Sequence, residues 1–124
     1  MNNLLAIAIG GSLGAVMRYL TSVSVHKLLG AGFPYGTLTV NVIGSLLMGF
    51  ISILLLERLM LADFWRPIII IGFLGAFTTF STFSMETFNL IEAGEMAKAF
   101  INMFVNVLFC LCATWLGVIA GRQL

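Results

Sequence analysis

Residues 72–84 read GFLGAFTTFSTFS, and they lie in the middle of an apolar stretch where leucine and isoleucine would be expected. The segment includes two glycines, three threonines, two serines and four phenylalanines. Gly75 lets the backbone leave the helical conformation at low cost, and the β-branched pair Thr78 and Thr79 has a weak preference for helix. The pattern therefore predicts a helix that is broken in its middle.

The composition around this segment is typical of a protein embedded in lipid. Of 124 residues, 60% are hydrophobic and only 9% are charged, whereas a soluble domain carries roughly 25% charged residues. Six basic and five acidic side chains cannot cover a water-soluble particle of this size. A net charge of +1 also provides no basic patch for nucleic acid. The chain is therefore expected to contact the lipid bilayer and not nucleic acid.

The few charges divide the chain into lengths that suit a membrane. A spanning helix needs about 20 mostly apolar residues, and we expect spans at about 4–26, 36–57, 67–92 and 97–121. The linkers between them are too short to form a separate domain, so residues 1–124 are expected to form a single integral membrane domain. The predicted fold class is an all-α membrane protein with four transmembrane helices, the third broken at mid-membrane.

The basic residues give almost no preference for one orientation in the membrane. Four spans place both termini and the 57–66 loop on one side, which then carries Arg58, Arg66 and Arg122, while the other side carries Lys27 and Lys98. Orientation follows the Lys and Arg content of short loops, and three against two is nearly balanced. The sequence therefore suggests insertion in both directions and a dual-topology antiparallel homodimer.

Four spans are also few for enclosing a polar pathway, which is a second reason to expect an oligomer. Small residues at four-residue spacing allow helices to approach closely. They occur in three of the spans, at Gly10 and Gly14, Ser45 and Gly49, and Gly117 and Gly121.

Polar residues inside the apolar spans are candidates for function, because burying them in lipid is costly. They are Arg18, Asn41, Glu86, Asn102, Asn106 and Thr114. A purely structural interpretation is also open. The Arg18 side chain could extend to the membrane interface, and Asn41 and Asn106 could form hydrogen bonds between helices.

The segment after the predicted break combines aromatic rings with hydroxyl groups. Phe80 and Phe83 are three residues apart and share a helix face, and Ser81, Thr82 and Ser84 lie beside them. The edge of a phenyl ring is electropositive, so ring edges and hydroxyl donors together can bind a small anion. Carbonyl oxygens freed at the break could separately bind a hard cation such as Na⁺.

Three classes of protein other than an anion-binding membrane protein fit the sequence less well. A small multidrug-resistance-like transporter has the same size and dual topology, and it is the main alternative, but it needs a carboxylate in the first span. No acidic residue precedes Glu57. A purely structural subunit would have no reason to gather hydroxyl groups at a helix break. An enzyme is not expected, because no nucleophile–base pair or set of metal ligands is visible.

Three segments together resemble the Fluc (CrcB) family of fluoride channels over the whole length of the chain. They are GAFTTFSTFS at 75–84 with Glu86, GGSLGAVMR at 10–18, and GTLTVN at 36–41. The resemblance implies an antiparallel dual-topology homodimer with two pores in the bacterial inner membrane. It also implies passive export of cytoplasmic fluoride, driven by the membrane potential, which reduces fluoride toxicity.

The same resemblance assigns roles to individual residues. A structural Na⁺, which is not transported, would bind at the dimer centre to the backbone carbonyls of Gly75 and Thr78 from both subunits. Ring edges of Phe80 and Phe83 would contact fluoride. The rest of the fluoride pathway would comprise Asn41, Ser81, Thr82, Thr114 and, in the vestibule, Arg18.

Four further residues are weaker candidates: Thr39, Glu86, Asn106 and Cys110. Glu86 corresponds to an acidic residue near the end of the pore. Cys110 occupies a position where relatives carry serine, and a thiol is a weak hydrogen-bond donor. We therefore expect the Cys110 side chain to be dispensable for conduction.

Overall fold

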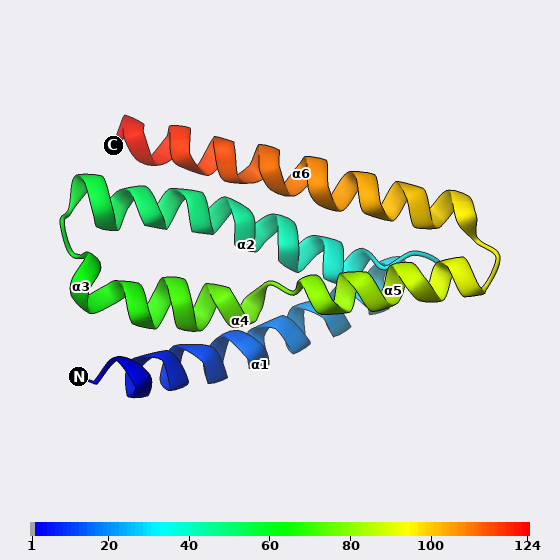
Figure 1. Ribbon diagram of the computed structural model, residues 1–124, viewed down its shortest axis with the longest axis horizontal. Helices are drawn as coiled ribbons and strands as arrows, with labels where there is room; N and C mark the ends of the chain where they lie inside the picture. Colours follow the sequence, from blue (N-terminus) through cyan, green and yellow to red (C-terminus); the bar gives the residue numbers. More distant parts are fainter. Residues whose placement is uncertain (1) are drawn as a thin grey trace.

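The computed structural model describes residues 2–124, and every regular element in this range is helical (Figure 1). Four helices are long and apolar enough to cross a membrane: Asn3–Leu29, Tyr35–Arg58, Ala62–Glu92 and Met96–Gln123. Each end of the four predicted spans lies within five residues of the corresponding observed end. The prediction of four long apolar helices is therefore confirmed.

Two of the four long helices are composite. The first and the fourth long helices are continuous, and they are α1 (Asn3–Leu29) and α6 (Met96–Gln123). The second consists of α2 (Tyr35–Ile53) and a π-helical turn, η1 (Leu54–Arg58). The third comprises four pieces: α3 (Ala62–Trp65), the π-helical segment η2 (Arg66–Leu74), α4 (Gly75–Phe77) and α5 (Phe80–Glu92).

Both termini lie at the same end of the bundle, together with the turn that joins η1 to α3 (Figure 1). The turn between α5 and α6 lies at the opposite end. The three arginines expected on one side are therefore at the terminal end of the bundle, where Arg122 forms an exposed ion pair with Glu57 at 3.4 Å. Lys98 lies at the other end, where its Nζ donates to the Gly32 carbonyl at 3.0 Å.

Glycines bring α1 into direct backbone contact with η2. A Cβ atom on Gly10 would overlap the carbonyl oxygen of Ile68, and one on Gly14 would overlap the carbonyl of Phe73. Any larger residue at either glycine would push the two helices apart. This pair of glycines therefore serves the close packing that its spacing predicted.

Glycines also bring α2 into direct backbone contact with α6. A Cβ atom on Gly49 would overlap the carbonyl oxygen of Thr114, and one on Gly117 would overlap the carbonyl oxygen of Leu46. The α2–α6 pair and the α1–η2 pair are thus two closely packed units, and the remaining helix, α5, follows the break in the third span.

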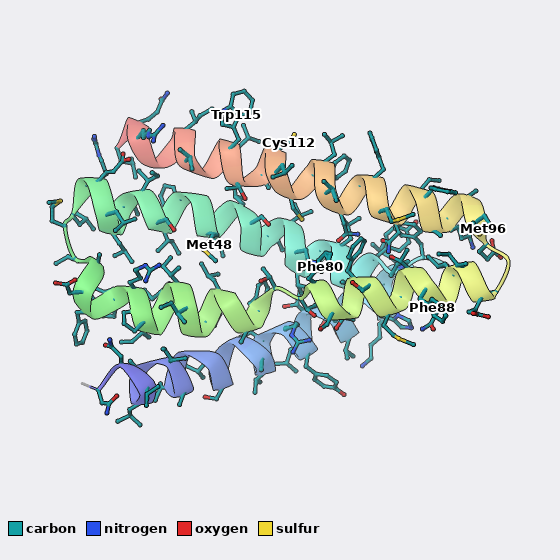
Figure 2. All side chains as sticks on the ribbon, viewed as in Figure 1. Met48, Phe80, Phe88, Met96, Cys112 and Trp115 are labelled. Carbon is teal, nitrogen blue, oxygen red and sulfur yellow. The ribbon has the colours of Figure 1, made fainter. Side chains whose placement is uncertain are left out.

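The bundle buries polar groups and exposes apolar ones. Five polar residues are buried: Thr37, Asn41, Thr87, Asn102 and Asn106. By contrast, large apolar side chains such as those of Trp115 and Phe88 point away from the bundle (Figure 2). The interior also holds apolar side chains such as Val40 and Leu74, and an apolar exterior around an interior that includes polar groups is expected of helices that face lipid.

Candidate functional site

The third long helix is interrupted at two threonines. The helix α4 ends at Phe77, and both Thr78 (φ −82°, ψ 159°) and Thr79 (φ −153°, ψ 114°) adopt extended backbone conformations before α5 begins at Phe80. The predicted interruption is therefore present, but Gly75 remains helical (φ −61°, ψ −35°). The β-branched threonines tolerate the extended conformation better than the helical one, so the chain opens there and not at the glycine.

The hydroxyl groups of both threonines bond to the backbone beside the interruption. The Thr78 hydroxyl donates at 3.1 Å to the Leu74 carbonyl, which also accepts from the Thr78 N–H at 3.2 Å. The Thr79 hydroxyl oxygen accepts from the Thr82 backbone N–H at 3.2 Å, which makes Thr79 the N-cap of α5. The sequence therefore contains both the interruption and the cap that restarts the helix.

Asn41 of α2 holds the interrupted backbone in place. Its Oδ1 accepts from the Thr79 N–H at 2.7 Å, and its Nδ2 donates to the Thr79 carbonyl at 3.1 Å. The second hydrogen of Nδ2 is directed to Oδ1 of Asn106 on α6, at 3.2 Å. Both amide hydrogens of Asn41 thus have protein acceptors, and an anion binding to Asn41 would have to replace one of them.

This pairing leaves one helix carbonyl without its usual partner. In a continuous helix the N–H of Thr79 would donate to the carbonyl of Gly75, four residues earlier. Here it donates to Asn41. The carbonyl of Gly75, which the resemblance implicates in cation binding, therefore loses the donor that would otherwise occupy it.

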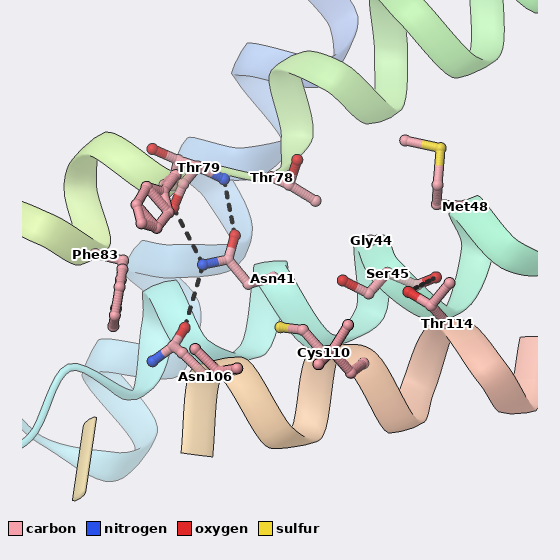
Figure 3. A pocket seen from close by; sticks show the side chains of 13 residues that line it. Asn41, Gly44, Ser45, Met48, Thr78, Thr79, Phe83, Asn106, Cys110 and Thr114 are labelled. Atoms are coloured by element: carbon pink, nitrogen blue, oxygen red, sulfur yellow. Dashed lines mark hydrogen bonds between the residues drawn. The ribbon is translucent and has the colours of Figure 1, made fainter. Parts of the chain in front are cut away.

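A cavity of about 380 Å³ lies between the interruption, α2 and α6 (Figure 3). The lining residues from α2 are Asn41, Gly44, Ser45 and Met48; from the interruption and α5, Thr78, Thr79, Phe80 and Phe83; and from α6, Asn106, Val107, Cys110, Leu111 and Thr114. Seven of the predicted site residues line it: Asn41, Thr78, Phe80, Phe83, Asn106, Cys110 and Thr114. The cavity carries hydroxyl, amide and aromatic groups and, within residues 2–124, no carboxylate.

The two phenylalanines of the cavity differ in exposure. Their ring centroids are 5.3 Å apart with an interplanar angle of 53°. Phe83 is only 8% exposed and is enclosed by the chain itself, whereas Phe80 is 71% exposed. One ring of the pair is therefore buried and the other lies open at the rim of the cavity.

The predicted hydroxyl residues are distributed over two regions. Thr114 lines the cavity, and its hydroxyl donates to the Ser45 carbonyl at 3.2 Å. Ser81 and Thr82 do not line it; their hydroxyls lie 3.3 and 3.0 Å from the Thr79 hydroxyl. Thr39 is also outside the cavity, and its hydroxyl donates to the Tyr35 carbonyl at 2.8 Å.

Arg18 contacts the end of α4 and does not line the cavity. Its Nε donates to the carbonyl of Ala76 at 3.0 Å. The last carbonyls of a helix lack internal donors and attract positive charge. Arg18 therefore caps the helix that ends just before the interruption.

Glu86 belongs to a second, smaller cavity of about 220 Å³ that includes His26 and the loop before α2. Its Oε1 is buried and, within the part of the chain that the structure describes, accepts no hydrogen bond. Glu86 is therefore separate from the group of residues around the interruption.

Several lining residues were absent from the predicted site. The β-branched side chain of Thr79 predicts only a weak helix former, whereas in the structure its hydroxyl caps the start of α5, a role for which threonine is well suited. Gly44 has no signal in the sequence: a Cβ atom there would overlap the Thr78 methyl group, a contact between distant segments. Ser45 and Met48 likewise reach the cavity through the packing of α2 against α6.

Comparison with known proteins places this arrangement in a family. A family model described as "CrcB-like protein, Camphor Resistance (CrcB)" matches residues 5–118. A Coxiella burnetii protein named "Fluoride-specific ion channel FluC" is 51% identical over 123 residues, which cover 98% of this chain and 99% of the relative. A protein of the same name from Geobacter sulfurreducens is 49% identical over 124 residues and 100% of both chains.

A third relative with this name, from Photobacterium profundum, is 56% identical over 111 residues, or 90% of this chain and 87% of its own. These relatives are named as ion channels and not as enzymes, which agrees with the prediction that this chain is not an enzyme. The family model covers nearly the whole chain, and the alignments cover 87–100% of these relatives. The chain therefore belongs to the CrcB family.

Proposed function

We propose that this multi-pass membrane protein is a fluoride-selective ion channel. The observation that carries the proposal is the cavity at the interruption, where hydroxyl and amide groups lie beside Phe80 and Phe83 and no carboxylate is among the lining residues. A lining that is rich in donors and free of negative charge favours an anion. The relatives named fluoride-specific ion channels support fluoride as that anion.

The chemistry of the lining suits a small and strongly hydrated anion. To leave water, fluoride needs several donors that replace its hydration shell, in the way that filter oxygens replace the shell of a cation. The electropositive edges of Phe80 and Phe83 can act with the Thr114 hydroxyl, which would have to turn from the Ser45 carbonyl to the ion. At Asn41, fluoride would have to replace the acceptor of one of the two donated hydrogen bonds, which are now the Thr79 carbonyl and Asn106 Oδ1.

The proposed direction of net transport is out of the cell. Fluoride enters from acidic surroundings as neutral HF, which dissociates in the cytoplasm and leaves the anion trapped. A negative interior favours exit of an anion by about 2.3 kcal/mol for each 100 mV. A passive pathway is therefore sufficient to lower cytoplasmic fluoride in a bacterial inner membrane.

We also propose that a structural Na⁺ binds to the carbonyl oxygens of Gly75 and Thr78. Na⁺ fits these residues because it takes oxygen ligands. The Gly75 carbonyl can serve as one, since the Thr79 N–H that would occupy it in a continuous helix is paired with Asn41. Two carbonyls are too few for one ion, so the same pair from a second copy would complete the site. The ion would fix the two interruptions to each other.

The functional unit is proposed to be an antiparallel dual-topology homodimer, with residues 1–124 as one membrane domain and the interruption at mid-membrane depth. The exposed ring of Phe80 supports this, because a phenyl group meant to contact an anion must be shielded from lipid by another surface. The nearly balanced basic residues at the two ends of the bundle agree with insertion in both directions.

Fluoride efflux from liposomes tests the function. Purified protein is reconstituted with a fluoride gradient, valinomycin and K⁺ balance the charge, and chloride is the comparison ion. We expect rapid release of fluoride without release of chloride. A folded, reconstituted protein that releases neither ion would contradict the proposal, and a proton-coupled transporter would then be the better interpretation.

Removal of Na⁺ tests the cation separately. We expect prolonged dialysis into a Na⁺-free buffer of another monovalent cation to reduce the flux or dissociate the dimer, and added Na⁺ to restore both. An intact dimer with full flux after verified Na⁺ removal would show that the proposed ion is not needed.

A further inference from the structure

Five residues form a continuous chain of hydrogen bonds from α5 through α6 and α2 to the interruption. Asn102 Nδ2 donates to the Thr87 hydroxyl at 2.9 Å, and Asn106 Nδ2 donates to Asn102 Oδ1, also at 2.9 Å. Asn41 Nδ2 donates to Asn106 Oδ1, and Asn41 in turn pairs with both backbone groups of Thr79. Of the five, Asn102 and Thr87 do not line the cavity.

The direction of every hydrogen bond in this chain is fixed at its two ends and at Asn106, whose Nδ2 also donates to the Asn102 backbone carbonyl at 2.9 Å. At one end, the Thr87 hydroxyl donates to the carbonyl of Phe83 at 2.8 Å, so its oxygen can only accept from Asn102. At the other end, the Thr79 N–H can only donate, so Asn41 must present its Oδ1 there. Each amide between these ends then has one orientation that satisfies both neighbours.

Burial gives this order an energetic consequence. Asn102 is 1% exposed, and Thr87, Asn106 and Asn41 are also buried. A buried polar group that loses its partner is costly because water cannot replace the partner. An amide that turned over would leave its neighbours facing like groups, donor to donor or acceptor to acceptor, so the three asparagines are expected to keep their orientation together.

We propose that Asn102 and Thr87 are positioning residues for ion conduction: they orient the amides of Asn106 and Asn41, which hold the interrupted backbone at Thr79. The inference rests on the proposed function, because the property that they control is flux through the cavity. Thr87 also ties the chain to the turn that carries Phe83. The aromatic pair and the interruption are therefore held in register by one set of hydrogen bonds.

Thr87 offers a matched pair of variants. Thr87→Val removes the hydroxyl and keeps the size and branching of the side chain, whereas Thr87→Ser keeps the hydroxyl. We expect Thr87→Val to lower fluoride flux by about three- to tenfold, the range given by the loss of one buried hydrogen bond, and Thr87→Ser to retain flux within about twofold of wild type.

Asn102→Leu tests the next position. It leaves the Asn106 amide without an acceptor on Asn102 Oδ1, and we expect flux to fall by more than about tenfold. Asn3→Leu is the control, because Asn3 is exposed at the start of α1 and remote from the cavity. If Asn102→Leu does not fold, the Thr87 pair still decides the question.

Nuclear magnetic resonance of the side-chain amides separates positioning from a general effect on folding. The chain has six asparagines, so the reconstituted dimer labelled with ¹⁵N-asparagine gives few side-chain signals. We expect Thr87→Val to shift the signals of Asn102, Asn106 and Asn41, and Thr87→Ser to leave those of Asn106 and Asn41 in place.

Reduced flux together with shifted Asn106 and Asn41 signals in Thr87→Val, both retained in Thr87→Ser, supports the proposal. Full flux in Thr87→Val overturns it, and so does reduced flux without a shift at Asn41, because the effect would not pass through the amides. A wild-type protein that carries no fluoride contradicts the proposed function itself. If the wild type conducts and Thr87→Val conducts equally well, the proposed function stands and only the positioning role is overturned.

Discussion

The third membrane helix packs in opposite ways before and after its interruption. Before it, η2 lies directly on α1, with Gly10 and Gly14 allowing contact between the two backbones. After it, α5 is tied to its neighbours by side-chain hydrogen bonds, such as the one from Asn102 to Thr87. One half of the same span is thus fixed by shape and the other by polar groups.

The difference indicates where stability and transport reside. Backbone contact through glycine supplies close packing in lipid, where helices gain little from the hydrophobic effect, and it offers no group to a passing ion. The half of the span after the interruption supplies hydrogen-bond donors, and its structure depends on each donor having the right acceptor. Changes before the interruption should therefore act on folding, and changes at or after it should act on flux.

The largest effect is expected on the polar side, from Phe80→Ile. This change removes the ring edge and keeps the apolar bulk, so the dimer should remain folded while fluoride efflux falls at least about a hundredfold, or about 2.7 kcal/mol in the barrier. Phe88→Ile is the control, because Phe88 is an exposed phenylalanine of the same helix outside the cavity. Efflux at the wild-type rate in Phe80→Ile would refute contact between ring and ion.

On the closely packed side, Gly14→Ala should reduce stability. The new Cβ would overlap the Phe73 carbonyl, so α1 must move away from η2, at a cost of about 2 kcal/mol. Gly11→Ala is a close control, since the nearest atom to its new Cβ would be the Gly72 carbonyl oxygen at 3.8 Å. Thermal unfolding of both variants in detergent checks this, and equal midpoints would mean that backbone contact does not hold the pair together.

Gly44→Ala probes a glycine that faces the interruption. Its Cβ would overlap the Thr78 methyl group, so the extended segment must shift, and we expect about tenfold lower efflux, near 1.4 kcal/mol. Thr78→Ser removes that methyl group, so the double variant should regain most of the flux. A double variant as slow as Gly44→Ala would show that the overlap with Thr78 is not the cause.

The smallest effect is expected from Cys110→Ser. The side chain lines the cavity, and its thiol faces the Ser45 side chain, a partner that a serine at this position would keep. We expect fluoride efflux within about twofold of wild type, because serine is a better donor but of similar size. A change of tenfold or more in either direction would make this position part of the conduction machinery.

The four spans could be predicted because their limits are local: charges and short polar linkers bound each apolar stretch. The interruption was predictable for the same reason, since Thr78 and Thr79 are adjacent β-branched residues in a helix. Its position was less so. Gly75 stays helical, and the backbone opens instead at the two threonines, where Asn41 of another helix pairs with Thr79.

The site was predictable only as a set of residue types. Asn41, Phe83 and Thr114 meet at one cavity, as their polar or aromatic character within apolar spans suggested. The partners of Asn102 and Arg18 could not be predicted, because Thr87 and the Ala76 carbonyl lie on other segments of the bundle. The pathway roles assigned to the residues at the cavity, and to Ser81 and Thr82 outside it, remain predictions.

The most direct test of fluoride conduction through this protein is the reversal potential of single-channel or macroscopic current in a planar bilayer. Fluoride is set at unequal concentrations on the two sides, with chloride balancing the ionic strength. We predict that the current reverses at the equilibrium potential of fluoride, which under these conditions has the opposite sign to that of chloride. A reversal potential that follows chloride, or the absence of current from protein that is folded and inserted, would contradict a fluoride-selective pathway.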